Sequence, residues 1–186
     1  MKRFLDFSLS ISLIITLLPL LFLIAILIKL TSNGPVIFWS IRVGTGNSQF
    51  NMPKFRTMKI NAPVLATHLF MESNKFLTPI GSVLRKTSFD ELPQLWSILI
   101  GKMSFVGPRP ALINQNDLIA LRTEHGIDKL MPGLTGWAQI NGRDNLTILE
   151  KVEFELEYLQ RQSIWFDCKI ITLTFLRVAR QVGITH

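Results

Sequence analysis

The chain has 186 residues, 48% of them hydrophobic, and its 20 lysines and arginines exceed its 13 aspartates and glutamates to give a formal net charge of +7. This length allows one domain with a hydrophobic core, and the apolar content indicates contact with a membrane. The positive charge fits anionic lipid, phosphorylated substrates or nucleic acid about equally, and the single cysteine excludes an intramolecular disulfide.

An uncharged apolar segment, residues 8–28, lies near the N-terminus. As a helix rising about 1.5 Å per residue, it matches the roughly 30 Å hydrocarbon core of a bilayer. Pro19 divides it into two arms of ~10 residues that each reach half of that thickness, which favours a re-entrant hairpin. Basic residues before the segment (Lys2, Arg3) and after it (Lys29) favour the same arrangement, because such residues stay on the cytoplasmic side. A kinked transmembrane helix is the alternative.

No repeat or linker divides residues 31–186. Their pattern predicts strands at 36–41 and 50–58 joined by a turn at 44–47, a polar surface segment at 60–76, and helices at 112–125, 146–159 and 169–182. On the second of these helices we expect Glu150, Glu153 and Glu157 to face water. The last is typical of a core helix or of one on a membrane surface. We therefore expect an α/β fold, mostly helical with a few short strands.

Two adjacent carboxylates, Asp90 and Glu91, follow Ser88 in the Ser-x-x-Glu pattern of a capping box. This pattern predicts that both lie in the first turn of a helix. The helix N-terminus and the nearby cations Arg85 and Lys86 favour their ionised forms. An ionised, oriented aspartate is a competent nucleophile toward phosphorus, and a purely capping role is the alternative.

Further cations accompany this pair. The sequence Gly-Pro-Arg-Pro at 107–110 fixes Arg109 on a stiff backbone, and a guanidinium is well suited to bidentate phosphate contact. Lys54 and Arg56 lie in the second predicted strand. Near the other end of the chain, prolines and glycines surround Trp137 in residues 131–143, which predicts a sharply bent loop of the kind that binds ligands.

Four blocks of sequence, in the same order, resemble the bacterial sugar transferases, and more specifically the small monotopic phosphoglycosyl transferases, which move a sugar-1-phosphate from a nucleotide diphosphate sugar to a polyprenyl phosphate. The blocks are residues 54–58, 84–95, 101–110 and 132–143. The resemblance implies that Asp90 attacks a UDP-sugar, expels UMP and carries a phosphosugar ester, with Glu91 completing the dyad. It also implies Mg²⁺, bound by the diphosphate together with Asp90 and Glu91.

The same resemblance implies roles for other residues. Lys54 orients the dyad, and the phosphate-binding cations are Lys54, Arg56, Arg85 and Arg109. Nucleotide binding is expected in the fourth block, at Pro132, Gly133, Thr135, Gly136, Trp137, Gln139, Asn141 and Arg143.

The implied organisation is a re-entrant helix-break-helix anchor over residues 1–30, with its break at Pro19, and one compact catalytic domain with interfacial amphipathic helices over residues 31–186. Leu18 departs from the Ser-Pro pair common at this break. The chain resembles the minimal catalytic unit of the family. The expected partners are a UDP-sugar, undecaprenyl phosphate and phospholipid, with no nucleic acid, at the cytoplasmic face of a bacterial inner membrane.

Residues 111–117 and 120–124 resemble relatives that use N-acetylated amino or deoxyamino sugars. We therefore expect such a sugar, in the first membrane step of a surface glycan such as O-antigen or exopolysaccharide. Two alternatives stay open. One is a direct ternary-complex transferase that uses glucose- or galactose-1-phosphate, and the other is a non-catalytic basic membrane-binding protein.

Overall fold

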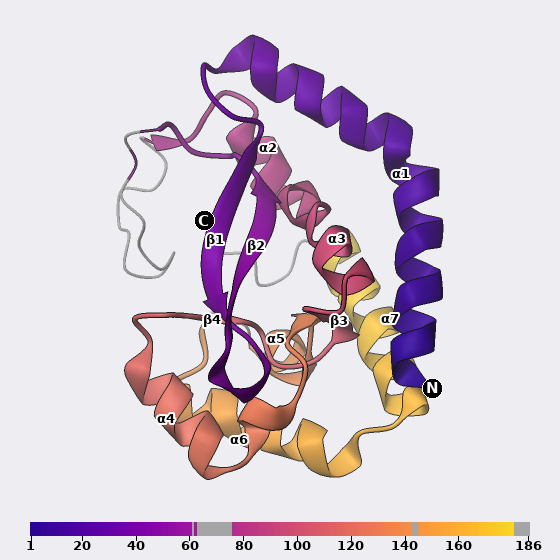
Figure 1. The fold of residues 1–186 in the computed structure, drawn as a ribbon, viewed down its shortest axis with the longest axis vertical. Coiled ribbons are helices and arrows are strands. Elements are labelled where there is room, and N and C mark those ends of the chain that lie inside the picture. The colour runs from indigo at the N-terminus through magenta and orange to yellow at the C-terminus, as the bar shows by residue number, and fades with distance from the viewer. Residues whose placement is uncertain (61, 63–75, 143–144, 181–186) are drawn as a thin grey trace.

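The computed structural model describes residues 1–60, 62, 76–142 and 145–180. The predicted mixed α/β class, mostly helical with short strands, is confirmed (Figure 1). The α-helices are α1 (Lys2–Thr31), α2 (Gly81–Lys86), α3 (Gln94–Leu99), α4 (Asn116–Glu124), α5 (Trp137–Asn141), α6 (Ile148–Arg161) and α7 (Ile164–Arg180). The strands are β1 (Ile37–Val43), β2 (Gln49–Phe55), β3 (Ser104–Val106), β4 (Ala111–Leu112) and β5 (Gly133–Thr135), and the 3-10 helices are η1 (Thr45–Asn47), η4 (Phe89–Glu91) and η5 (Ile127–Lys129).

Two small sheets carry the strands. The predicted hairpin is confirmed as β1 and β2, which pair antiparallel with Ile37 opposite Phe55, and β4 pairs with the other edge of β1. In the second sheet β3 and β5 run parallel, with Ser104 opposite Gly133. Each sheet leads into a segment that carries a predicted site residue, because Lys54 is near the end of β2 and Arg109 follows β3.

The three predicted C-terminal helices are confirmed as α4, α6 and α7, with shifted ends. Helix α6 begins with a capping box, in which Thr147 and Glu150 satisfy each other's backbone N–H groups. The predicted polar segment at 60–76 lies largely outside the described residues.

Helix α1 is continuous through Pro19, so the expected break into two helices is not observed. Figure 1 shows instead that the helix changes direction part-way along its length. A proline inside a helix removes one hydrogen bond and bends the axis, while the bonds on either side can keep the helix intact. Within the part of the chain that the structure describes, α1 is the helix long and apolar enough to cross a membrane.

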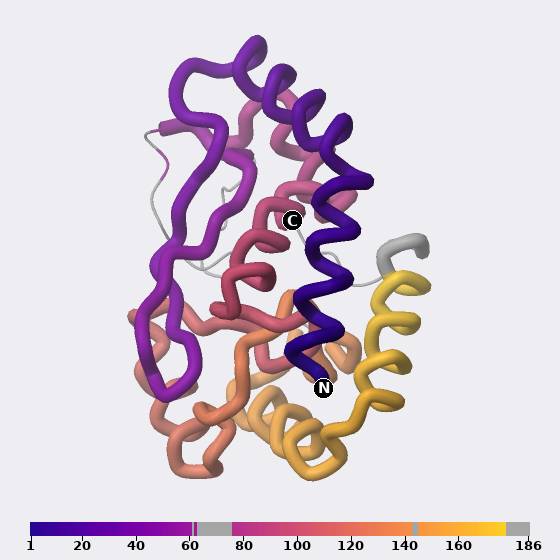
Figure 2. The backbone as a smooth tube through the Cα atoms, turned by 45° about the vertical axis from the view of Figure 1, so that its right-hand side comes forward, coloured from indigo at the N-terminus to yellow at the C-terminus, as the bar shows by residue number. Residues whose placement is uncertain are grey.

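One face of α1 belongs to the core of the protein. The helix lies along α3 (Figure 2), and its buried Ile24 and Ile28 pack with Phe55 and Leu84. The opposite face exposes large apolar side chains, including Ile15 (67%), Phe22 (62%) and Leu30 (78%). Because one face is buried and the other is apolar and exposed, α1 can join the domain to an apolar medium.

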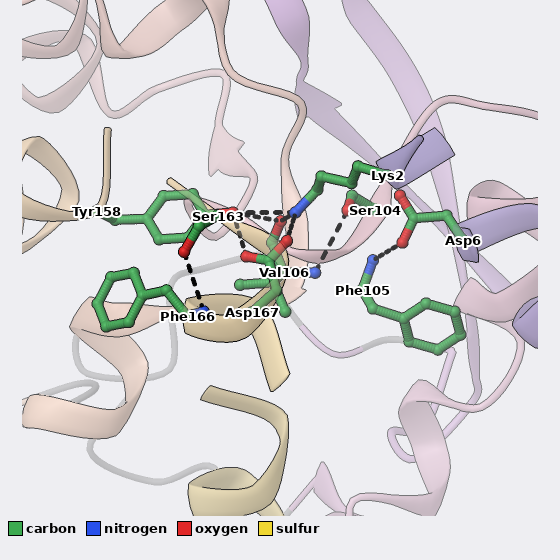
Figure 3. A network of polar contacts seen from close by, with 9 residues as sticks. All are labelled: Lys2, Asp6, Ser104, Phe105, Val106, Tyr158, Ser163, Phe166 and Asp167. Carbon is green, nitrogen blue, oxygen red and sulfur yellow. Dashed lines mark hydrogen bonds and ion pairs between the residues drawn. The ribbon is translucent and has the colours of Figure 1, made fainter. Parts of the chain in front are cut away.

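Polar side chains tie the beginning of α1 to the rest of the molecule. The Lys2 ammonium lies 2.5 Å from Asp167 and 2.9 Å from both the Tyr158 hydroxyl and the Val106 carbonyl (Figure 3). Asp6 accepts a hydrogen bond from a β3 amide, and Arg3 donates to the carbonyls of Ile98 and Leu99 at the end of α3. Lys2 and Arg3 therefore do not simply flank a membrane segment, as the charge argument assumed.

The end of α1 is also bound to the domain. Arg56, which is 5% exposed, donates to the Ser32 carbonyl and hydroxyl at 3.0 and 2.7 Å and also to the Asn33 carbonyl. Because both ends of α1 are hydrogen-bonded to one body, they lie on the same side of any membrane that the helix enters.

Candidate active site

The Asp90–Glu91 pair lies in η4, directly before α3. The predicted capping box does not form, because the Ser88 side chain makes no capping hydrogen bond and its backbone is left-handed, with φ 58°. The carboxylate of Glu91 turns instead toward two cations. The carboxylates are thus held on a short turn ahead of the helix and not within its first turn.

Three residues from separate segments surround the carboxylates. Lys54 Nζ lies 2.7 Å from Glu91 Oε1, and Arg109 Nη2 lies 2.9 Å from the same oxygen. The distance from Lys54 Nζ to Asp90 Oδ2 is longer, 3.9 Å. Glu91 is therefore held by both cations, whereas Asp90 makes the weaker contact and is the carboxylate more available to a substrate.

Burial treats the two acids differently. Burial raises the pKa of Asp90 above its ordinary value, and this effect outweighs the attraction of Lys54. Burial also acts to raise the pKa of Glu91, but Arg109 and Lys54 outweigh it and hold that pKa well below its usual range. The expectation that nearby cations keep Asp90 readily ionised was wrong, because desolvation dominates there.

The other two predicted phosphate-binding cations lie in different surroundings. Arg85 donates to the Thr57 hydroxyl at 3.1 Å, and burial lowers its pKa while the charge of Asp90 partly restores it. Arg85 therefore borders the site. Arg56 does not, because its guanidinium is directed at Ser32 and Asn33 at the end of α1. The structure thus assigns Arg56 to the anchor and not to the phosphate cluster.

Arg42 belongs to the site but was missed in the sequence. Burial and the neighbouring charge of Arg109 lower its pKa to about 10, against the opposing attraction of Glu91. Its Nη1 donates to the Pro110 carbonyl at 3.2 Å. Arg42 lies in β1, 67 positions before Arg109 in the chain (109 minus 42), and only the pairing of β1 with β4 brings the two together.

Residues 131–143 are not the loop that was predicted. They contain β5 and α5, and the glycines permit close backbone packing. A Cβ on Gly133 would lie 2.1 Å from the Gly107 amide nitrogen, and one on Gly136 would lie 2.2 Å from the Gly107 carbonyl oxygen. The segment therefore supports the turn that carries Arg109.

Several proposed nucleotide-binding residues have partners within the protein. Trp137 Nε1 donates to Glu157 at 2.6 Å, so Glu157 does not simply face water as expected, and Thr135 pairs with Thr174 at 2.7 Å. The remaining members are placed as follows: Pro132 and Gly136 are buried, Gln139 donates to the Leu134 carbonyl, Asn141 donates to the Trp137 carbonyl, and Arg143 lies outside the described residues. Nucleotide binding by this set stays a prediction.

The site suits a multiply charged anion. Arg42, Lys54, Arg85 and Arg109 supply positive charge, and Asp90 supplies a carboxylate that could attack phosphorus. Among the described residues there is no group of three or more potential metal-ligating side chains. The adjacent carboxylates still fit Mg²⁺, which proteins commonly bind through one or two carboxylates together with substrate phosphates.

Comparisons with known proteins are consistent along the chain. The family model described as "Bacterial sugar transferase" matches residues 1–181. The "UDP-glucose:undecaprenyl-phosphate glucose-1-phosphate transferase" of Escherichia coli (strain K12) is 40% identical over 184 residues, covering 95% of this chain and 40% of that protein. The "Galactosyl transferase CpsE" of Streptococcus agalactiae serotype III (strain NEM316) is 36% identical over 195 residues, with coverages of 98% and 43%. The "Uncharacterized sugar transferase EpsL" of Bacillus subtilis (strain 168) is 38% identical over 187 residues, with coverages of 99% and 90%. The chain therefore spans less than half of two of these relatives and most of the third.

Proposed function

The chain belongs to the bacterial sugar transferase family, as its four sequence blocks predicted, and we propose that it transfers a sugar-1-phosphate from a UDP-sugar to undecaprenyl phosphate with release of UMP. The observation that carries this proposal is the unequal treatment of two adjacent acids. Glu91 is bound by Lys54 and Arg109, while Asp90 lies beside them without a comparably short ion pair.

The proposed reaction has two displacement steps at one phosphorus atom. In the first, an Asp90 carboxylate oxygen attacks the sugar-bearing phosphorus, the bond from that phosphorus to the bridging oxygen breaks, and UMP leaves. In the second, a phosphate oxygen of undecaprenyl phosphate attacks the same phosphorus, and the Asp90 carboxylate leaves. The sugar-1-phosphate thus passes through Asp90, and the enzyme returns to its initial state.

The surrounding cations explain how an anion can attack another anion. A carboxylate approaching a diphosphate meets electrostatic repulsion that Lys54, Arg85 and Arg109 reduce. Burial that raises the pKa of Asp90 also leaves its ionised form poorly solvated and therefore more reactive. Mg²⁺ held by Asp90 and Glu91 together with the diphosphate would add positive charge that helps UMP to leave.

The names of the relatives bear on the sugar. The Escherichia coli relative is named for glucose-1-phosphate and the Streptococcus agalactiae relative for galactosyl transfer. Neither name supports the N-acetylated amino sugar expected from residues 111–124. We therefore propose glucose or galactose as the transferred sugar, in the synthesis of a surface polysaccharide.

The arrangement of α1 supports a membrane-bound, monotopic protein. Its outer face is apolar and exposed, while both of its ends are hydrogen-bonded to the domain. A domain that holds both ends cannot lie on two sides of a bilayer, so we propose that α1 enters and leaves by one face. On the cytoplasmic face of a bacterial inner membrane, Asp90 could then be reached by a soluble UDP-sugar and a lipid phosphate.

The experiment is a UMP-release assay on the purified full chain in lipid nanodiscs with Mg²⁺ and undecaprenyl phosphate. UDP-glucose, UDP-galactose and UDP-N-acetylglucosamine are compared in parallel. We expect UMP from a UDP-hexose, its loss in Asp90→Asn, and its retention in Asp117→Asn, a matched change at an exposed aspartate on α4.

Each other outcome selects an alternative. A preference for UDP-N-acetylglucosamine would restore the amino-sugar prediction. Absence of UMP with every donor would contradict the proposal and favour a membrane-binding protein whose acids have a structural role.

A further inference from the structure

Three consecutive carbonyls hold the turn that carries Arg109. The Pro108 carbonyl accepts from the Gly133 amide at 2.8 Å, the Arg109 carbonyl from Arg122 Nη2 at 3.0 Å, and the Pro110 carbonyl from Arg42 Nη1 at 3.2 Å. The donors come from β5, α4 and β1. Because prolines lack an amide hydrogen, two residues of this turn have no backbone donor, and its carbonyls are the groups by which other elements can hold it.

Arg122 is itself fixed by a buried partner. Its Nε lies 2.7 Å from Glu155 Oε2 and its Nη2 lies 2.5 Å from Glu155 Oε1, which makes a two-pronged ion pair between α4 and α6. The side chains are only 9% and 3% exposed. A guanidinium bound in this way has one orientation, so its remaining donor geometry is directed at the Arg109 carbonyl.

The surroundings of this pair are apolar. Leu118, one turn before Arg122 on α4, and Val152, one turn before Glu155 on α6, belong to the same buried cluster. A buried ion pair contributes little net stability compared with apolar residues of similar size, because both charges lose their hydration. Packing of α4 against α6 therefore does not by itself account for these charges at these positions.

We propose that Arg122 and Glu155 are positioning residues for Arg109, and this inference rests on the proposed function. Glu155 orients Arg122, Arg122 holds the carbonyl of Arg109, and the Arg109 side chain reaches Glu91 at 2.9 Å. Arg42 supports the same turn from β1. The buried pair thus sets where the guanidinium of Arg109 meets the dyad and the substrate phosphates.

The test replaces both charges together, in Arg122→Met/Glu155→Leu, so that neither is left buried alone. Displacing a reacting or binding group by about 1 Å can cost ~100-fold in rate. We therefore expect kcat/KM for the UDP-sugar to fall about 10- to 100-fold. The matched control is Lys2→Met/Asp167→Leu, which likewise replaces a partly buried ion pair with apolar residues, but between α1 and α7.

A double-mutant cycle with Arg109→Lys separates positioning from general damage to the fold. If Arg122 and Glu155 act through Arg109, their replacement lowers the residual single-turnover rate of Arg109→Lys by less than about threefold. Any loss caused by the control pair should instead multiply in full with that of Arg109→Lys. Full multiplication for Arg122→Met/Glu155→Leu as well would overturn the proposal.

Amide hydrogen exchange gives a second result that does not depend on activity. We expect exchange in residues 107–112 to become at least about tenfold faster in Arg122→Met/Glu155→Leu and to stay unchanged in the control pair. Unchanged exchange there would overturn the positioning role. If the wild-type chain releases no UMP while the exchange result holds, the proposed function fails and the structural link between the pair and the turn stands.

Discussion

The ammonium of Lys54 lies 2.7 Å from the Oε1 atom of Glu91, and both groups are largely buried. This contact holds the dyad at the end of β2. We expect Lys54→Met to lower kcat/KM by at least about 100-fold and the free energy of unfolding by about 3 kcal/mol, because Glu91 loses one of its two charge partners. Lys86→Met, at an exposed cation nearby, is the control. Chemical denaturation and UMP release measure both quantities, and equal losses in the two variants would refute the specific role of Lys54.

The two adjacent acids should respond in opposite ways to neutralisation. Burial raises the pKa of Asp90, so its ionisation weakens folding above that pKa; the pKa of Glu91 is lowered, so its ionisation strengthens folding above its ordinary value. At pH 7.5 we expect Asp90→Asn to raise the melting temperature and Glu91→Gln to lower it. Differential scanning fluorimetry of the two near-isosteric variants provides the measurement. Shifts of the same sign would contradict the inferred difference between the acids.

The pH dependence of the rate should report Asp90. Nucleophilic attack requires its ionised form, and burial moves its pKa upward. We therefore expect kcat/KM to fall as the pH decreases through a value above the ordinary aspartate range, while Glu91 stays ionised over the same interval. Activity measured from pH 4.5 to 8.5 tests this prediction. A rate that is constant down to the ordinary aspartate pKa would show that Asp90 is not shifted.

Membrane topology provides a separate test. Because both ends of α1 are bound to one body, an epitope tag placed before Met1 and a cysteine introduced at the exposed Ser48 should be accessible from the same side. The cysteine variant is made in a Cys168→Ser background, since Cys168 is exposed. We expect both sites to be protected in spheroplasts and accessible in inverted vesicles. Access to the tag alone in spheroplasts would show that α1 crosses the membrane.

Local pattern was sufficient for much of the fold. Alternating apolar residues predicted the β1–β2 hairpin, and helical spacing predicted α6, where Thr147 and Glu150 also form a capping box. The same capping pattern failed at Ser88, because the side chain of Glu91 has stronger partners in Lys54 and Arg109. Those partners come from distant segments, so local sequence could not show which one would prevail.

The parts that were missed depend on contacts between distant residues. The glycines near Trp137 were taken as turn formers, but Gly133 and Gly136 allow β5 and α5 to approach Gly107 closely. Arg56 was grouped with Lys54 by proximity in sequence, although its partners are at the end of α1. Glu155 left a usable signal, since it lies three residues after the buried Val152 and therefore on the apolar face of α6.

The central claim is that Asp90 carries the sugar phosphate between donor and acceptor, and the most direct measurement is to trap that species. The full chain is incubated with Mg²⁺ and UDP-glucose or UDP-galactose labelled at the sugar-bearing phosphorus, without undecaprenyl phosphate, and then quenched in acid. We expect label on the protein in an amount equal to the UMP released, lost on addition of undecaprenyl phosphate and absent from Asp90→Asn. UMP release that requires the acceptor and leaves no label on the protein would contradict the account and indicate direct transfer in a ternary complex.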